Sequence, residues 1–389
     1  MALAAGVSCT PPPSGDGAGW NHLSSASAGP TWETRGEKTG GGGTVSAESC
    51  LSSFTGLITE LQQNFGFRTS KIATWANQAR FDARGGIWTS LLNGSDRKNT
   101  APIQFGVDWG TNLISPSGSG RRDIYSIEFN TYPQSTSLCF HGGTVIGTQP
   151  LNATWREVKE GGGGYAITWN TSGLSTIEYM RIHNHEDAFV PYRSTSFIIQ
   201  DNWVSYTRDD CIENDAFGAG VIRNNLFDSC FVFYSAVNPP VLGPDAPIGA
   251  GASGVVRVER NLIKMGNAPA YRAGSDRTKL GYGAFFKAHD RESPVRVPRM
   301  VLRDNVVAYE VPGWWHGRGA PPTSLKTGKV RVTECSNNTI LWLGDGSFPG
   351  PIPDALSGCF KIVTGKAARD QWTALRQQWI DAHPDIPRL

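Results

Sequence analysis

The chain has 389 residues, of which 39% are hydrophobic, so it is long enough and apolar enough to bury a core. Charged residues make up only 18%, and the formal net charge is +2, which argues against a coiled coil, a helix bundle or a nucleic-acid-binding coat. We find no run of about 18 apolar residues, so we expect no membrane span. The 46 glycines favour many turns between short strands.

The first fifty residues have a composition that cannot bury enough surface to fold. They contain the run Pro11-Pro12-Pro13, many serines, and four glycines at 40–43. This predicts a flexible arm over residues 1–50. The small residues that lead up to Cys9 resemble the end of a signal peptide, which favours a secreted, cell-surface or periplasmic protein.

Two segments have helical periodicity. Residues 54–65, FTGLITELQQNF, place Leu57, Ile58 and Leu61 on one face and predict a short N-terminal cap helix. Residues 368–382, ARDQWTALRQQWIDA, place Trp372, Leu375 and Trp379 on one helical face and predict a second helix. Two prolines follow and mark its end. We therefore expect a main domain over 51–367 and a C-terminal capping helix with a tail over 368–389.

A repeated asparagine lies in the region between these helices. Short apolar strands flank each copy, as in FIIQDNWVSY (197–206), GVIRNNLFDS (220–229) and VRVERNLIKM (256–265). The repeated positions are Asn202, Asn225, Asn261, Asn305 and Asn338. An asparagine suits a sharp bend because its side-chain amide can satisfy the backbone groups that the bend exposes.

The intervals between these asparagines are 23, 36, 44 and 33 residues. The shortest suffices for one coil of a solenoid with two or three strands, and the longer ones hold Pro/Gly-rich insertions such as 238–254 and 310–328. We therefore predict an all-β fold, a single-stranded right-handed parallel β-helix with short capping helices, in preference to a β-sandwich. The end coils would expose strand edges, so we expect the two helices to cover them.

The cysteines leave two pairings open. Cys211 and Cys230 are 19 residues apart, and Cys335 and Cys359 are 24 apart, so each pair is either a disulfide or two buried thiols. No two cysteines form a CxxC motif, which argues against a zinc site.

The densest polar cluster runs from His183 to Asp187 and continues from Arg208 to Asp215. Asp187 precedes Asp209 by 22 residues, close to one coil, so the two carboxylates should stack about 4.8 Å apart. Mutual repulsion would raise the pKa of one of them and leave an acid and a base, the pair that glycoside hydrolysis requires. Both aspartates of Asp209-Asp210 can face one cleft only if the strand bends there.

The segment Asp209-Asp210-Cys211-Ile212 resembles the Asp-Asp-Cys-Val/Ile stretch of the polygalacturonases, a family of parallel β-helix hydrolases. Glu186-Asp187 falls where that family has Asn-Thr-Asp one coil earlier. The resemblance implies that Asp210 is the general acid, and that Asp187 and Asp209 activate the water in an inverting mechanism.

We further expect a polysaccharide substrate and no nucleic-acid partner; the oligomeric state is left open. Aromatic rings stack on sugar faces, and polar groups beside the acids would orient the substrate. The candidate substrate-binding residues are His183, Glu213, Tyr206, Arg208, Trp314, Trp315 and His316.

Other interpretations of the acidic cluster stay open. The carboxylates could cap backbone N–H groups of turns in a non-catalytic glycan-binding or adhesion solenoid. They could also bind calcium, although the preferred hydrolase needs no cofactor. Calcium would favour a polysaccharide lyase acting by β-elimination on a uronate glycan, with Tyr206, His183 or His289 as the base.

Overall fold

The computed structural model describes part of the chain, and between residues 56 and 130 it describes only the backbone of short strands. The described residues are 49–50, 56–58, 70–71, 79–82, 92–93, 103–114, 127–130, 136–147, 150–160, 164–170, 173–192, 196–237, 254–266, 268–269, 280–289, 297–311, 331–349 and 358–389.

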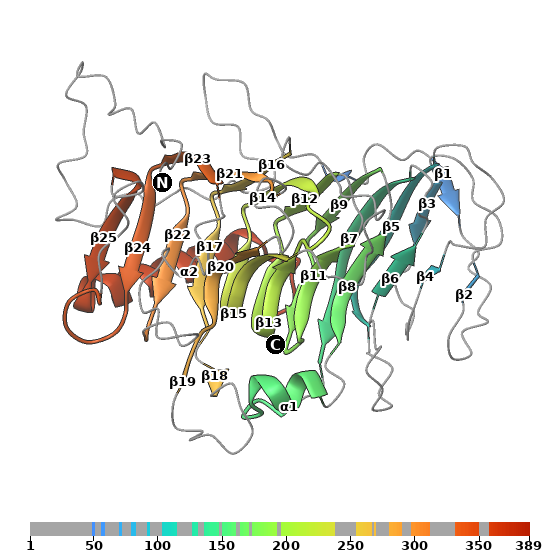
Figure 1. The fold of residues 1–389 in the computed structure, drawn as a ribbon. Helices are drawn as coiled ribbons and strands as arrows, with labels where there is room; N and C mark the ends of the chain where they lie inside the picture. The colour runs from blue at the N-terminus through green and yellow to red at the C-terminus, as the bar shows by residue number, and fades with distance from the viewer. Residues whose placement is uncertain are drawn as a thin grey trace, which may run out of the picture.

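The fold is a parallel β-helix, as the sequence predicts (Figure 1). All strands but two belong to one parallel sheet that curves 320° around an axis. In chain order the elements are β1 (Gly56–Ile58), β2 (Ser70–Lys71), β3 (Ala79–Asp82), β4 (Leu92–Asn93), β5 (Ile103–Ile114), β6 (Ile127–Asn130), β7 (Thr136–Ile146), α1 (Trp155–Glu160), β8 (Tyr165–Asn170), β9 (Leu174–Glu178), β10 (Arg181–His183), β11 (Asp187–Pro191), β12 (Ser196–Gln200), β13 (Trp203–Glu213), β14 (Ala219–Arg223), β15 (Leu226–Val237), β16 (Val255–Glu259), β17 (Leu262–Met265), β18 (Ala268–Pro269), β19 (Leu280–Gly281), β20 (Ala284–His289), β21 (Arg299–Arg303), β22 (Val306–Tyr309), β23 (Arg331–Ser336), β24 (Asn338–Trp342), β25 (Phe360–Thr364) and α2 (Gly365–Ala382).

Each central coil has three sides, which we number in chain order. The first side holds β9, β12, β14, β16, β21 and β23, and the second begins directly after the asparagine bend with β10, β17, β22, β24 and the first residues of β13 and β15. The third side holds β8, β11, β20 and the later residues of β13 and β15. Backbone hydrogen bonds join each strand to the coils before and after it, so no central coil is complete alone.

The core fills the inside of the tube with side chains that stack along the axis. On the third side one such row is Phe189, Ile212, Tyr234 and Phe286, which are paired in register on successive coils. All four are buried, with exposures of 0–1%. Alternation along each strand therefore directs one set of residues inward and leaves the other for the outer surface.

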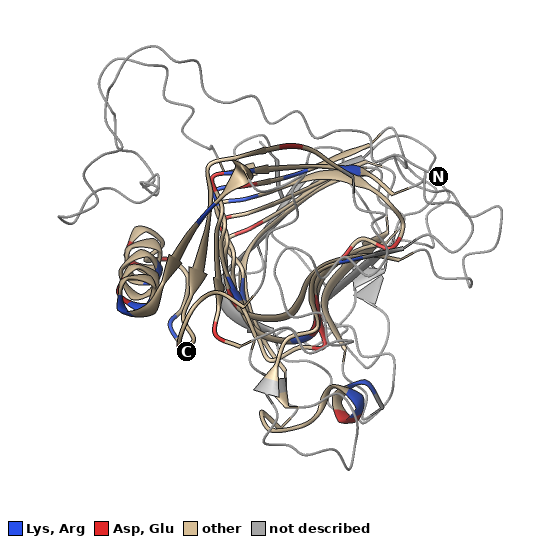
Figure 2. Cartoon of the chain, turned by 60° about the vertical axis from the view of Figure 1, so that its left-hand side comes forward, with Lys and Arg blue, Asp and Glu red and all other residues tan. Residues whose placement is uncertain are grey.

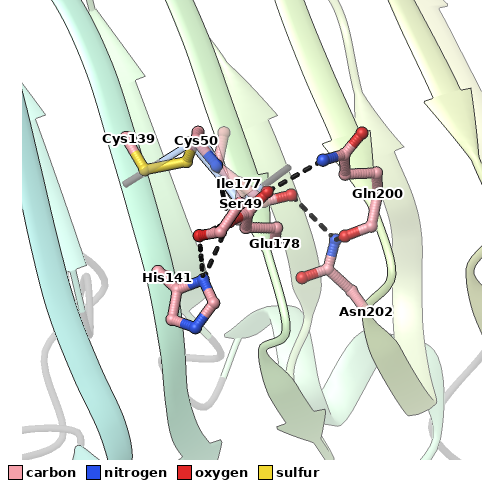
Figure 3. Close-up of a disulfide and its surroundings, with 8 residues drawn as sticks. All are labelled: Ser49, Cys50, Cys139, His141, Ile177, Glu178, Gln200 and Asn202. Carbon is pink, nitrogen blue, oxygen red and sulfur yellow. Dashed lines mark hydrogen bonds and ion pairs between the residues drawn. A yellow bond between two sulfur atoms is a disulfide. The ribbon is translucent and has the colours of Figure 1, made fainter. Parts of the chain in front are cut away.

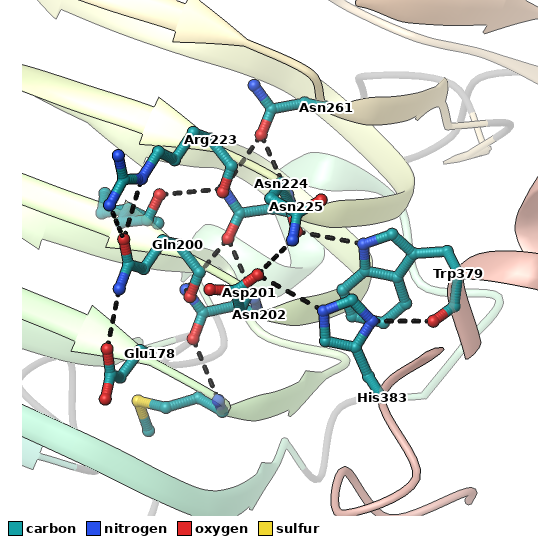
Figure 4. Close-up of polar contacts among 12 residues, drawn as sticks. Glu178, Gln200, Asp201, Asn202, Arg223, Asn224, Asn225, Asn261, Trp379 and His383 are labelled. Carbon is teal, nitrogen blue, oxygen red and sulfur yellow. Dashed lines mark hydrogen bonds and ion pairs between the residues drawn. The ribbon is translucent and has the colours of Figure 1, made fainter. Parts of the chain in front are cut away.

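The repeated asparagines form a ladder at the bend between the first and second sides (Figure 4). The Oδ1 of Asn261 accepts the backbone N–H of Asn225 (3.1 Å) and also its Nδ2 (2.9 Å). The Nδ2 of Asn261 donates to the carbonyl oxygens of Glu259 (3.1 Å) and Ile222 (2.8 Å). Asn202, Asn305 and Asn338 continue the pattern, which confirms the predicted role of the amide.

The backbone geometry explains why the bend needs this support. The residue before each ladder asparagine has a left-handed conformation, with φ between 54° and 56° at Asp201, Asn224, Arg260, Asp304 and Asn337. Such a residue turns the chain sharply and withdraws backbone groups from the strand hydrogen bonds. The asparagine amide that follows restores those hydrogen bonds at every coil.

The C-terminal helix is confirmed and begins three residues before its predicted start, at Gly365. Its apolar face, which includes Trp372 and Trp379, packs on outward-facing residues of the second side such as Trp203 and Leu262. Figure 2 shows the helix beside the coiled sheet rather than over its end. The predicted C-terminal capping helix is therefore present, and it covers the outer surface of the second side.

The predicted N-terminal cap helix over 54–65 is wrong where the structure describes that segment. Residues 56–58 form β1, which pairs in parallel with β3. The β-branched Ile58 suits a strand, and hydrogen bonding to the next coil outweighs the helical spacing of the apolar residues. The remaining residues of that prediction lie outside the described ones.

One predicted cysteine pair is a disulfide, Cys211–Cys230, while Cys335 and Cys359 are present as thiols. A second disulfide, Cys50–Cys139, joins the last residue of the predicted arm to β7 (Figure 3). The neighbouring Ser49 Oγ donates to Glu178 Oε1 at 2.6 Å. Ser49 and Cys50, at the end of the predicted arm, are therefore anchored on the first side.

Removing the Cys211–Cys230 disulfide should destabilise the protein without changing the fold. The disulfide closes a loop with a sequence separation of 19. In the chain-entropy model a loop of this size contributes about 3 kcal/mol by restricting the unfolded chain. We expect the variant Cys211→Ala/Cys230→Ala to lose that amount in urea unfolding. Reductant should lower the stability of the wild type by more than that of the variant, because the variant keeps only the Cys50–Cys139 disulfide. Equal stability of variant and wild type would contradict this account.

Candidate active site

The acidic residues of the predicted site lie on the third side, on the neighbouring strands β11 and β13. The register pairs Phe189 with Ile212, so Asp187 lies opposite Asp210. The backbone N–H of Asp210 donates to Asp187 Oδ1 at 2.7 Å. We expected Asp187 to stack on Asp209, one residue earlier; the structure corrects that register by one.

A local irregularity turns both aspartates of β13 toward the same cluster. The pairing of β13 with β15 shifts between Thr207 and Asp210, and Tyr206 just before it has a φ of 59°. Cys211 and Ile212 directly after it return to the core. The bend that the sequence analysis requires at 209–210 is therefore present.

Five carboxylates gather around this bend. Oxygen atoms of Glu186, Asp187 and Asp209 lie within 4.8 Å of one another, and so do those of Asp187, Asp210 and Glu213. Asp187, Asp209 and Asp210 are buried, with exposures of only 1–2%. So many buried acids can coexist only if protons or cations neutralise part of their charge.

Two lysines from distant parts of the chain supply positive charge. Lys159 of α1 places Nζ 3.1 Å from Asp209 Oδ2 and 3.4 Å from Glu186 Oε1. Lys287 of β20 places Nζ 2.7 Å from Asp210 Oδ2 and 3.8 Å from Asp209 Oδ1. Asp209 therefore has both lysines within 4.0 Å.

This arrangement separates the protonation states of the two adjacent aspartates. Burial alone would raise the pKa of Asp209, but Lys287 and Lys159 outweigh burial and hold the pKa below its ordinary value. Burial raises the pKa of Asp210 to about 7, with Lys287 opposing the rise and the charge of Asp209 adding to it. Near neutral pH, Asp209 is ionised while Asp210 holds a proton about half of the time.

The other acids of the cluster are harder to ionise. Burial and the neighbouring carboxylates raise the pKa values of Asp187 and Glu213 well above their ordinary range. Burial raises the pKa of Glu186 to about 7 against the opposing charge of Lys159. Asp187 is thus harder to ionise than an ordinary aspartate, which does not suit the role of a base that the resemblance implies for it.

The carboxyl groups of Asp210 and Glu186 should make the protein less stable as the pH rises. Both hold protons in the folded state up to about pH 7, whereas the unfolded chain releases them near 3.8 and 4.5. Their stabilising contribution is therefore complete below those values and is lost as the pH rises through 7, at about 1.4 kcal/mol per pH unit and group. We expect the double variant Glu186→Gln/Asp210→Asn to show a flatter dependence of urea stability between pH 5 and 8 than the wild type. Identical slopes would contradict the raised pKa values.

The predicted substrate-binding residues fall into four groups, of which Tyr206 and Arg208 form the last. Glu213 belongs to the acidic cluster. His183 lies on the second side, where its Nδ1 is 2.8 Å from Ser205 Oγ and burial lowers its pKa. Trp314, Trp315 and His316 lie outside the described residues.

Tyr206 and Arg208 contact one surface segment at the start of the third side. The Tyr206 hydroxyl donates to the carbonyl oxygen of Leu151, and Arg208 Nη1 donates to the same oxygen at 2.8 Å. The guanidinium carbon of Arg208 lies 5.0 Å from the centre of the Tyr206 ring. The two side chains form one unit beside the acidic cluster.

Sequence reasoning missed the role of Lys159 and the helix that carries it. Residues Thr154 and Glu157 form a capping box, in which Glu157 N–H donates to Thr154 Oγ1 (3.2 Å) and Thr154 N–H donates to Glu157 Oε2 (2.8 Å). That Thr-x-x-Glu spacing is readable from the sequence and marks the start of a helix. Nothing in the sequence places this helix against the third side.

The acids are hard oxygen ligands of the kind that calcium prefers. However, the ammonium groups of Lys159 and Lys287 lie against two of the acids and provide the cationic charge there. We therefore assign no metal to the cluster.

The fold and site define a parallel β-helix protein with a buried acid–lysine cluster on its third side. Comparison with protein-family models, with curated proteins and with solved structures finds no match. Of the helices in the described part of the chain, none has the length and apolarity to cross a membrane. The two disulfides are typical of an extracytoplasmic protein.

Proposed function

We propose that the acidic cluster is the active site of an extracytoplasmic glycoside hydrolase that acts on a polysaccharide. The supporting observation is the placement of Lys159 and Lys287, which both face Asp209, while only Lys287 contacts Asp210. Two adjacent carboxyl groups with different proton affinities are what acid–base cleavage of a glycosidic bond requires.

In this mechanism Asp210 is the general acid. Its carboxyl proton goes to the glycosidic oxygen as the bond between that oxygen and the anomeric carbon breaks. A pKa of about 7 keeps a useful fraction of Asp210 protonated at neutral pH and makes the proton easy to transfer. Lys287 stabilises the carboxylate that remains, through its contact of 2.7 Å with Asp210 Oδ2.

Asp209 is the base in the inverting reaction. A water molecule attacks the anomeric carbon from the face opposite the leaving group and gives a proton to the ionised Asp209. Asp187 is a poorer choice because its pKa is raised. Asp187 instead fixes the backbone of Asp210.

The test is to incubate the wild-type protein with a panel of neutral and acidic polysaccharides. The proposal predicts new reducing ends, and NMR of the first products should show an inverted anomeric configuration. Products that absorb in the ultraviolet as unsaturated uronates would instead indicate a lyase. Binding of a glycan with neither product would indicate an adhesion protein and contradict the hydrolase.

A further inference from the structure

A buried arginine beside the acidic cluster has hydrogen-bond donors that no described residue accepts from. Arg208 is only 1% exposed. Its Nη1 donates to the Leu151 carbonyl, but its Nε and Nη2 are buried and have no hydrogen-bond partner in the described part of the protein. Burial lowers the pKa of Arg208, yet a guanidinium remains charged at neutral pH.

The two donors without an acceptor lie on the same edge of the guanidinium. Nε–H and one N–H of Nη2 point in nearly parallel directions, and this edge binds both oxygens of a carboxylate, sulfate or phosphate. Arg223 shows the same edge in use, since its Nε and Nη2 both donate to Gln200 Oε1, at 2.9 and 2.6 Å. In Arg208 that edge lacks such an acceptor.

The charge of Arg208 also lacks a close counterpart. Among the residues that the structure describes, no carboxylate oxygen lies within 4.0 Å of its nitrogens, although Asp209 is its neighbour in sequence. Asp209 faces Lys159 and Lys287 instead. No carboxylate pairs directly with this buried guanidinium, and the charge of Glu157 acts on it from a longer distance. An anion that binds only the folded protein would therefore stabilise it.

We infer that Arg208 forms an oxyanion-binding site, in which Nε and Nη2 hold two oxygens of a carboxylate or of a tetrahedral anion such as sulfate. The two donors are themselves buried, while Nη1 of the same guanidinium contacts the carbonyl of the exposed residue Leu151. This inference does not depend on the hydrolase proposal, because it uses none of the acids of the cluster.

A neighbouring histidine has a buried ring nitrogen that accepts but does not donate, so it adds no hydrogen bond to a bound oxyanion. The N–H of Arg208 donates to the carbonyl of His185 at 2.8 Å, which places His185 beside Arg208 on the preceding coil. His185 Nδ1 lies 3.2 Å from the Gly164 carbonyl and therefore carries the hydrogen, which leaves Nε2 as a buried acceptor without a hydrogen-bond partner. Burial lowers the pKa of His185 to about 4, so His185 stays neutral and adds no charge.

The test is a thermal-unfolding titration with sulfate and with acetate, against chloride at matched ionic strength. We expect at least one of the two oxyanions to raise the Tm of the wild type by about 2–4 °C at saturation. Sulfate also stabilises proteins without binding, so the comparison with variants decides. In Arg208→Gln the saturable rise should disappear, and Arg208→Lys should lose most of it because a lysine has no two-donor edge.

Arg223→Gln is the matched control, since the same edge of Arg223 already donates to Gln200, and it should keep the full rise. An equal rise in wild type and Arg208→Gln, or no rise with either oxyanion, would overturn the inference. If the Arg208 variants do not fold, crystals of the wild type soaked in selenate give the answer. An anomalous selenium peak beside Nε and Nη2 of Arg208 supports the site. A map that shows the Arg208 side chain clearly but has no such peak contradicts it.

Discussion

Replacing Asp210 by asparagine should lower glycoside hydrolysis by about 10²–10⁴-fold, the usual contribution of a general acid. The loss follows because an amide cannot donate a carboxyl proton to the leaving oxygen. The fold should persist, since Asp210 is already about half protonated near neutral pH and the asparagine Oδ1 can still accept from Lys287. The measurement is kcat on the best polysaccharide of the panel, with urea unfolding to compare stability.

Asp187→Asn is the matched control on the neighbouring coil. The raised pKa of Asp187 favours its protonated form, and an asparagine keeps an oxygen that accepts the N–H of Asp210. We expect this variant to retain most of the activity, while Asp209→Asn should lose as much as Asp210→Asn. Full activity of Asp210→Asn would exclude it as the acid, and inactivity of Asp187→Asn alone would restore Asp187 to the role of base.

Replacing Asn261 by alanine should destabilise the protein by about 3–6 kcal/mol, since several buried partners lose their hydrogen bonds at about 1–3 kcal/mol each. The N–H and Nδ2 of Asn225 lose their acceptor, and the carbonyl of Ile222 loses its donor. Asn261 is itself fully buried, so the variant leaves these groups in the protein interior. Urea unfolding of the oxidised protein measures the loss.

The control for the ladder is Asp304→Gly, at the same bend of a later coil. Asp304 is exposed and has a φ of 56°, which glycine adopts without strain. This change should alter stability by less than about 1 kcal/mol, because it leaves the amides of the ladder in place. If Asn261→Ala costs no more than Asp304→Gly, the ladder does not stabilise the bend.

The sequence predicts the architecture because the asparagine bend that defines each coil is visible in a short stretch of sequence. An asparagine between two apolar strands identifies each bend, and bends one coil apart must stack. The C-terminal helix is equally readable, since Trp372, Leu375 and Trp379 define one face. The N-terminal segment at Gly56–Ile58 is misread because pairing with β3, invisible in the segment itself, decides between helix and strand.

The site is predicted only in part, since its register and its cations depend on tertiary structure. The shift between Thr207 and Asp210 moves the partner of Asp187 by one residue, and no spacing rule anticipates it. Lys159 and Lys287 come from elements 50 and 77 residues away from the aspartates that they contact. The cluster of acids can therefore be predicted from the sequence, whereas which of the acids are protonated cannot.

The course of α2 has a consequence for how the molecule comes apart. Three side chains along the helix bond to different parts of the solenoid. Arg369 donates to the Leu343 carbonyl near the last coil, while Arg376 donates to Asp228 and Trp379 to the Asn224 carbonyl near the middle. A solenoid without a helix that bridges its coils can unfold from its last coil inward, one coil at a time. Here the terminal windings cannot peel away until the helix detaches from those near the middle, so the C-terminal half should open as a single cooperative unit.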